Sequence, residues 1–146
     1  MKTTIRKKRV AKPRKPRPAI NGYADWVGMR LFIYTPIRVV SEANQREHHM
    51  ATYRRKKQQQ VVMRAWLNRA RTMVPPDAVP REVQFTRYGG KRMDNDNLAG
   101  AFKHVRDEVA RWFGVDDGDA SVKWCEPAQE IHKADGIAVS ISYTAV

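Results

Sequence analysis

The chain has 146 residues, 42% of them hydrophobic, which fits one folded domain with a single core. Its formal net charge of +13 favours an anionic partner, and nucleic acid is the best candidate because no apolar stretch is long enough to cross a membrane. Cys125 is the only cysteine, which excludes an internal disulfide and any zinc site made of several cysteines.

The positive charge is concentrated at the N-terminus. Residues 1–18 hold nine of the 28 Lys and Arg residues and no acidic residue, so we expect a basic disordered tail. The tail serves either as an arm that follows phosphates or as a solubilising leader. Residues 19–146, with 19 basic and 15 acidic residues, form the predicted single domain. Because the tail lacks the apolar segment of a secretory signal, we expect a cytoplasmic protein.

The first half of this domain is expected to contain one strand and one long helix. We interpret residues 19–28 as a connector. Residues 29–35 are rich in β-branched and aromatic types, which predicts a strand, and Pro36 limits its length. A helix is expected from an N-cap at Ser41 to about Met73, where two prolines follow. Its predicted core-facing stripe is Val62, Trp66, Arg69 or Ala70, and Met73.

A run of four basic residues lies within this helix, namely Arg54, Arg55, Lys56 and Lys57, and three glutamines follow it. These side chains cannot all face a core. Such a run is more often a solvated face than a binding site, but the charge of the whole chain makes contacts to phosphates about as good an interpretation.

The second half begins with a strand and a helix. Residues 81–88 alternate between apolar and polar side chains, which predicts a half-buried strand, and Gly89-Gly90 ends it. A second helix is expected over residues 97–113, with Gly114 at its C-terminal cap. Its core-facing stripe is Leu98, Phe102, Val105, Val109 and Trp112.

The C-terminal segment is expected to add two strands. They comprise residues 121–126 and 136–144, which we interpret as a hairpin. The order strand, helix, strand, helix, strand, strand predicts an α+β or mixed α/β domain, in which a small mixed sheet packs against two main helices.

Two aspartates, Asp94 and Asp96, follow the glycine pair. Carboxylates held close together repel one another, so a cation usually neutralises them. In an extended segment, side chains two residues apart point to the same side, so both can reach one ion. Ligands that are all oxygen suit Mg²⁺ or Mn²⁺. The alternative interpretation is that the two acids only cap the following helix and favour its dipole.

A second acidic cluster, Asp116, Asp117 and Asp119, follows one helix length downstream. A helix of about sixteen residues spans roughly 24 Å. The second cluster therefore reaches the first only with the help of a loop or a partner subunit. Neither cluster has the ligand spacing of an EF-hand.

Several segments of the chain resemble the RusA-type Holliday junction resolvases of bacteria and their phages. The resemblance covers roughly residues 30–145. Residues 36–48 look like phage members of the group, and the stronger match consists of Lys91-Arg92-Met93-Asp94-Asn95-Asp96-Asn97-Leu98, Lys103-His104-Val105-Arg106-Asp107 and Phe113-Gly114-Val115-Asp116-Asp117.

The resemblance implies a metal site and a catalytic lysine. Asp94, Asp96 and Asp117 match the family's metal-binding carboxylates, with Asp116 the less favoured member of its pair. Lys103 matches the catalytic lysine, with one departure in spacing. In the family the lysine follows the second aspartate by four residues, a place that glycine occupies here, whereas Lys103 follows by seven. Steps of four and seven both return to about the same helix face.

The implied activity is a Mg²⁺-dependent endonuclease that resolves Holliday junctions by paired symmetric cuts, as a homodimer, in DNA recombination and repair. Branched DNA is then the expected partner. Asn97 can cap the helix or contact the DNA backbone, and Lys91, Arg92, Arg46 and the basic run 54–57 are candidate phosphate contacts. Two alternatives stay open: a non-catalytic basic nucleic-acid-binding protein, and a related nuclease that cuts flap or other branched DNA.

Overall fold

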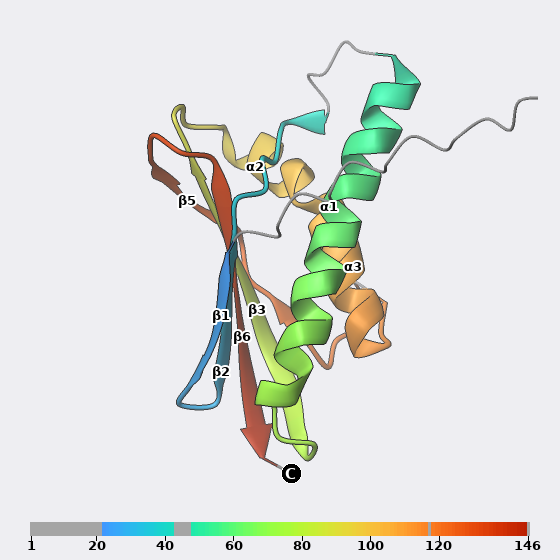
Figure 1. Cartoon of the computed structure of the whole chain (residues 1–146), viewed down its shortest axis with the longest axis vertical. Helices are drawn as coiled ribbons and strands as arrows, with labels where there is room; N and C mark the ends of the chain where they lie inside the picture. The colour runs from blue at the N-terminus through green and yellow to red at the C-terminus, as the bar shows by residue number, and fades with distance from the viewer. Residues whose placement is uncertain (1–21, 43–47, 117, 146) are drawn as a thin grey trace, which may run out of the picture.

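The computed structural model describes residues 22–42, 48–116 and 118–145. A six-stranded mixed sheet carries helices on one of its faces, which confirms the expected α+β class (Figure 1). The strand order is β1-β2-β6-β3-β4, and β5 also pairs with β3. None of the helices in these ranges is long and apolar enough to cross a bilayer. The expected basic tail, residues 1–18, lies outside the described residues.

Antiparallel pairing joins the first four strands of the sheet. β1 (Tyr23–Val27) and β2 (Arg30–Thr35) form a hairpin whose turn residues, Gly28 and Met29, both have positive φ. Two positive φ values in succession suit the tight turns that join twisted strands. β2 pairs with β6 (Gly136–Ala145), and β6 pairs in turn with β3 (Ala78–Gly89). The expected connector over residues 19–28 was therefore wrong where it covers β1.

The predicted hairpin at the C-terminus was also wrong. β4 (Lys123–Trp124) and an additional strand, β5 (Ala128–Ile131), both run parallel to β3, and β6 pairs with β3 antiparallel. Directly after β4, the backbone N–H of Cys125 donates to the Val83 carbonyl of β3 at 2.9 Å, which extends the pairing of this segment with β3 toward β5. Residues 121–126 and 136–144 therefore share one partner strand instead of pairing with each other.

The long helix starts later than expected. α1 (His49–Ala70) begins after His48, whose ring Nδ1 accepts a hydrogen bond from the Met50 N–H at 3.2 Å. Ser41 is not its N-cap, and residues 43–47 lie outside the described residues. The predicted end was right, because a 3-10 turn, η2 (Arg71–Met73), follows directly.

The buried face of α1 also differs from the predicted stripe. Of the predicted residues, Trp66 and Ala70 are buried, Val62 is only partly buried against the core, and Met73 is exposed. The buried members include two glutamines and are Gln59, Gln60, Met63, Trp66, Leu67 and Ala70. Gln59 is accommodated there because its side-chain amide donates to the Arg38 carbonyl at 3.2 Å. A glutamine with a hydrogen-bond partner can lie in a core at moderate cost.

The second predicted helix is two helices. α2 (Asn95–Ala101) ends at Phe102, which has φ −89° and ψ 0°, and α3 (Lys103–Phe113) follows at once. The apolar stripe continues through this break, with Leu98, Phe102, Val105 and Val109 all buried as expected. Gly114, at φ 76°, ends α3 as predicted.

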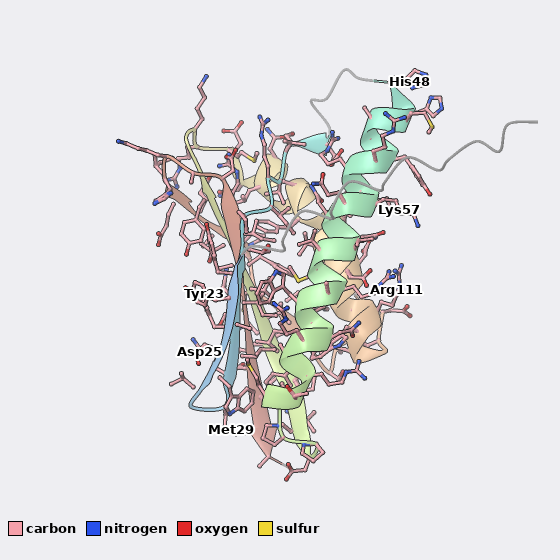
Figure 2. All side chains as sticks on the ribbon, in the orientation of Figure 1. Tyr23, Asp25, Met29, His48, Lys57 and Arg111 are labelled. Atoms are coloured by element: carbon pink, nitrogen blue, oxygen red, sulfur yellow. The ribbon has the colours of Figure 1, made fainter. Side chains whose placement is uncertain are left out.

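The core lies between the sheet and the pair α1 and α3, which run side by side in the same direction (Figure 1). Leu31 and Ile33 of β2 point into this core. The opposite face of the sheet carries a row of aromatic contacts, in which Tyr34 touches Tyr23 on β1 and Tyr88 on β3. Figure 2 shows Tyr23 on the side away from the helices. The helices therefore cover a single face of the sheet.

Replacing Phe102 by alanine is expected to lower the free energy of unfolding by about 3–5 kcal/mol. The ring is 1% exposed and stacks on Phe85 with 5.2 Å between centroids, so its removal leaves a cavity where α2 meets α3. Urea unfolding measures the change. The control is Val61→Ala, whose side chain is exposed on α1. An effect of Phe102→Ala as small as that of the control would contradict this role.

Candidate functional site

The loop that carries Asp94 is held from two sides. Buried Arg87 of β3 donates from Nη1 to the Lys91 carbonyl at 2.8 Å. Gln129 of β5 makes a two-way contact with Met93, because its Oε1 accepts from the backbone N–H at 2.9 Å and its Nε2 donates to the carbonyl at 2.6 Å. Both braces bind backbone atoms, so they fix the path of the loop and leave its acidic side chains free.

The carboxylates of Asp94 and Asp96 are exposed at the start of α2. Asp94 is the N-cap residue by position, but its side chain makes no capping hydrogen bond. Among the residues that the structure describes, neither carboxylate has a hydrogen bond or an ion pair. The two residues do not form the extended pair that we expected, since Asp94 is extended, with φ −64° and ψ 153°, but Asp96 already lies in the first helical turn. The capping interpretation therefore does not account for the side chain of Asp94.

Asn97 is occupied by a contact within the chain. Its Oδ1 accepts a hydrogen bond from the hydroxyl of Ser41 at 3.1 Å, and its side chain is only half-buried. Asn97 is not a helix cap, because that position belongs to Asp94. Ser41, which we expected at the start of the long helix, instead joins the segment after β2 to α2.

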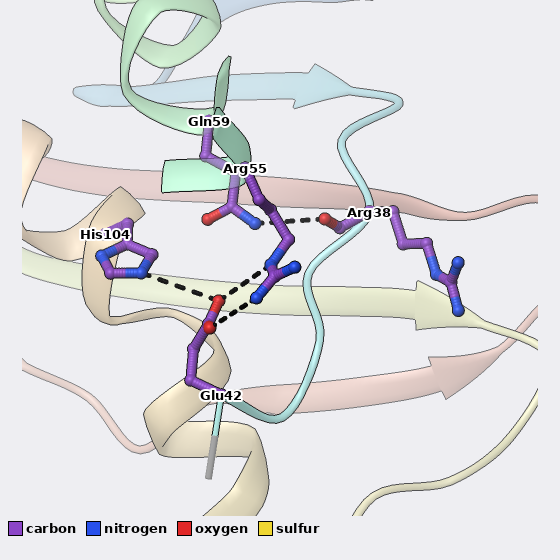
Figure 3. Close-up of polar contacts among 5 residues, drawn as sticks. All are labelled: Arg38, Glu42, Arg55, Gln59 and His104. Atoms are coloured by element: carbon purple, nitrogen blue, oxygen red, sulfur yellow. Dashed lines mark hydrogen bonds and ion pairs between the residues drawn. The ribbon is translucent and has the colours of Figure 1, made fainter. Parts of the chain in front are cut away.

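Glu42, the next residue, connects α1 with α3 (Figure 3). Its carboxylate accepts hydrogen bonds from Arg55 Nε at 3.1 Å and Nη2 at 2.7 Å. On its other side, the Nε2 of His104 lies 3.6 Å from the Glu42 Oε1. Arg55 is thereby committed to an ion pair with little exposure, so only part of the basic run 54–57 faces solvent.

His104 is the most enclosed titratable group near the site. Its side chain is 12% exposed, and neither ring nitrogen has a hydrogen-bond partner among the described residues. Burial lowers the pKa of His104, and the charges of Lys56 and Lys103 lower it further, while Glu42 and Asp107 raise it. The lowered pKa of this ring, which belongs to the second residue of α3, favours its uncharged form.

Lys103 is the first residue of α3 and is exposed. No described residue forms an ion pair or hydrogen bond with it. The neighbouring side chains fix its position, because Phe102 is in the core and His104 faces Glu42. Lys91 and Arg92 are exposed in the loop that precedes Asp94. This is the place near the acidic pair where the sequence led us to expect them.

The second acidic cluster is at the other end of α3. Asp116 and Asp119 line a hollow of about 560 Å³ together with Asp107 and Arg111. Hydrogen bonds from the side chain and backbone of Ser121 lower the pKa of Asp119. Because eleven residues of α3 rise about 16 Å, Asp116 is not next to the start of α2 within one chain. Asp117 and Arg46 lie outside the described residues.

Of the three expected metal ligands, Asp94 and Asp96 belong to the described residues and Asp117 does not. Within residues 22–42, 48–116 and 118–145, no group of three or more His, Cys, Asp or Glu side chains could hold an ion. Asp94 and Asp96 supply two oxygen donors without partners, which suit Mg²⁺ or Mn²⁺. A further ligand has to come from Asp117, a second chain, water or substrate.

Comparisons with known proteins give no family. No family model and no curated protein matches the chain. Among solved structures, "AaThiL complexed with AMPPCP and TMP" is similar with a TM-score of 0.38 and 8% sequence identity. The match covers 86% of this chain and 36% of that one.

Replacing Gln129 by alanine is expected to loosen the loop without unfolding the domain. It removes both hydrogen bonds to Met93, so amide hydrogen exchange over residues 91–94 should accelerate, and stability should fall by about 1–2 kcal/mol. Gln84→Ala is a matched control, since Gln84 also holds backbone through its amide, at the Phe85 and Glu126 carbonyls. Equal exchange at residues 91–94 in both variants would contradict the proposed brace.

His104 is expected to make stability depend on pH. Its pKa is lower in the folded state than the ordinary value of 6.5, so the unfolded chain takes up the proton first as the pH falls. The free energy of unfolding should therefore decrease as the pH drops below about 6.5, and His104→Gln should reduce that decrease. Urea unfolding at about pH 7.5 and about pH 5.5 measures it.

The control for this measurement is His49→Gln, because the His49 side chain is exposed at the start of α1. This variant should keep the pH dependence of the unmodified chain. If His104→Gln also keeps it in full, another group is responsible.

Proposed function

We propose that the chain is a Mg²⁺-dependent endonuclease of the RusA type that resolves Holliday junctions. One observation carries the proposal: two exposed carboxylates, Asp94 and Asp96, have no partner among the described residues, on a braced loop of a chain with net charge +13. Asp94 occupies the N-cap position of α2 without using its side chain as a cap, so the fold gives this carboxylate no role among the described residues. Its sequence neighbourhood also resembles the site of that family.

In this proposal the acids bind the ion and Lys103 acts on the substrate. Asp94, Asp96 and Asp117 would hold Mg²⁺ (or Mn²⁺), which would supply Lewis-acid activation of water and of the scissile phosphate. Lys103, exposed and without an ion pair to a described residue, places its ammonium beside the charge that develops on the phosphate oxygens. The next residue, His104, is enclosed beside Glu42 and lies on the same helical turn as Lys103.

A homodimer completes the proposed enzyme. A four-way junction has near two-fold symmetry, so two symmetric cuts require two sites related by a two-fold axis. The distance along α3 between Asp116 and the acidic pair makes a second copy a reasonable source of further ligands. Lys91, Arg92 and Arg46 contact phosphates next to the cut, and Asn97 supports the loop through Ser41.

The test is cleavage of a labelled four-way junction with Mg²⁺. We expect paired nicks that disappear in Asp96→Asn, with junction binding retained, because the change removes one ligand charge. Lys103→Ala should reduce the rate about 10²–10³-fold, the usual effect of losing one electrostatic contact to the transition state. Asp77→Asn and Lys133→Ala, both exposed and outside the site, make the same charge changes and should cut normally.

Three results would contradict the proposal in different ways. Binding without cleavage in Mg²⁺ and in Mn²⁺ would leave a non-catalytic nucleic-acid-binding protein. Equal cutting of flaps and junctions would leave a nuclease with a broader choice of branched substrate. An active Lys103→Ala variant would assign the electrostatic role to another residue.

A further inference from the structure

A basic groove runs between the two long helices. One face of α1 carries Tyr53, Lys56, Lys57, Gln60, Val61 and Arg64, at steps of three and four residues, and Arg111 of α3 lines the opposite wall. The groove has a volume of about 270 Å³ and follows α1 for about 16 Å. Figure 2 shows Lys57 and Arg111 on the helical side of the molecule, pointing away from the sheet.

The charges of this groove are not balanced within the described part of the chain. Arg64 and Arg111 share a single carboxylate, that of Glu108. Lys56 and Lys57 have no ion pair with any described residue, and Lys57 lies 5.9 Å from the centre of the Tyr53 ring. Four cations therefore line a narrow groove in which Glu108 is the one paired anion among the described residues, and the hollow lined by Asp107, Asp116 and Asp119 adjoins this groove at Arg111. The excess of positive charge along α1 favours a bound polyanion.

The groove differs from the rest of the basic run. Arg55 lies between the groove residues in sequence, yet its guanidinium turns to Glu42 and holds the segment after β2. The structure thus divides the run into Arg55, which stabilises the fold, two lysines that line the groove, and Arg54, which is exposed and is not among the groove residues. The sequence alone left a solvated face and a binding site about equally open for this run.

The groove also begins beside the candidate site. Lys56 and Lys103 are both near His104, because the positive charge of each lowers the pKa of that ring, and Lys103 precedes His104 at the start of α3. From there the cations continue along α1 to Arg64 and Arg111, near the opposite end of α3. Lys103 and the groove cations therefore place positive charge near both ends of α3.

We propose that this groove holds the phosphate backbone of one duplex arm as that arm leaves the candidate site. The identity of the ligand as DNA rests on the proposed function. One strand of B-DNA advances about 3.4 Å per base pair along the axis, so the groove matches about five base pairs. Lys56 and Lys57 each contact a phosphate, and the exposed Tyr53 supplies a flat surface against the sugar-phosphate chain.

The test compares two variants that lose the same charge. Lys56→Gln/Lys57→Gln removes two groove cations, and Arg30→Gln/Arg81→Gln removes two exposed cations from the sheet strands. Fluorescence anisotropy measures their binding to a four-way junction, a linear duplex and a single strand in EDTA, across a range of salt concentrations. Circular dichroism and urea unfolding establish that both variants are folded.

For junction and duplex alike, the groove variant should lower the slope of log affinity against log salt by about 2, one unit for each lost phosphate contact. The sheet variant should leave the slope nearly unchanged. Equal slopes in the two variants would overturn the proposal, because the loss would then reflect net charge alone. A reduced slope only for the single strand would also overturn it, by placing unpaired DNA in the groove.

This result is separable from the nuclease test because it is obtained without metal. If the chain binds DNA through the groove but cuts nothing in Mg²⁺, the groove stands and the proposed activity falls. If it cuts junctions and the groove variant binds with an unchanged salt slope, the activity stands and the groove falls.

Discussion

Glu108 is the buried charge on which the pairing of α1 with α3 depends. Its side chain is 2% exposed and accepts hydrogen bonds from Arg64 Nε at 2.6 Å and Arg111 Nη1 at 2.9 Å. A carboxylate buried without such partners would cost several kcal/mol, so the two helices are stable together only in the register that brings Arg64 to Glu108. The same register sets the position of the first turn of α3 relative to α1, and Lys103 lies in that turn. The same two arginines then form one end of the basic groove.

A division of roles among polar side chains follows from this packing. Gln129 comes from β5, and Ser41 and Glu42 come from the segment after β2; they bind the loop, α2 and the neighbours of Lys103. Their hydrogen-bonding capacity is used within the fold. Asp94, Asp96 and Lys103 sit on the elements so fixed, and none of them has a partner among the described residues. Rigid backbone with unpaired charges at its surface is the arrangement that a binding or catalytic site requires.

Local patterns in the sequence predicted local features, and the contacts between distant segments were not predictable. The stripe from Leu98 to Val109 and the cap at Gly114 follow from periodicity and from a residue type, and both were confirmed. The break at Phe102 was missed because the stripe continues through it. Alternation identified the C-terminal strands but says nothing of their partner, which is β3 for each of them. For the site, spacing drew attention to Asp94 and Asp96, whereas no pattern marks Gln129 as the residue that holds their loop.

The opposed charges of the site and the groove have a thermodynamic consequence in the proposed nuclease. Phosphates brought to Asp94 and Asp96 are repelled by two carboxylates unless a cation lies between them, whereas the groove attracts phosphates without any cation. An arm held in the groove raises the local concentration of DNA at the acidic pair, and the ion removes the remaining repulsion. Metal and DNA therefore bind with positive coupling at the site, and reciprocity requires that DNA strengthen metal binding by the same factor as metal strengthens local DNA contact. A pair of carboxylates that holds an ion weakly alone can in this way hold it firmly once the substrate is in place.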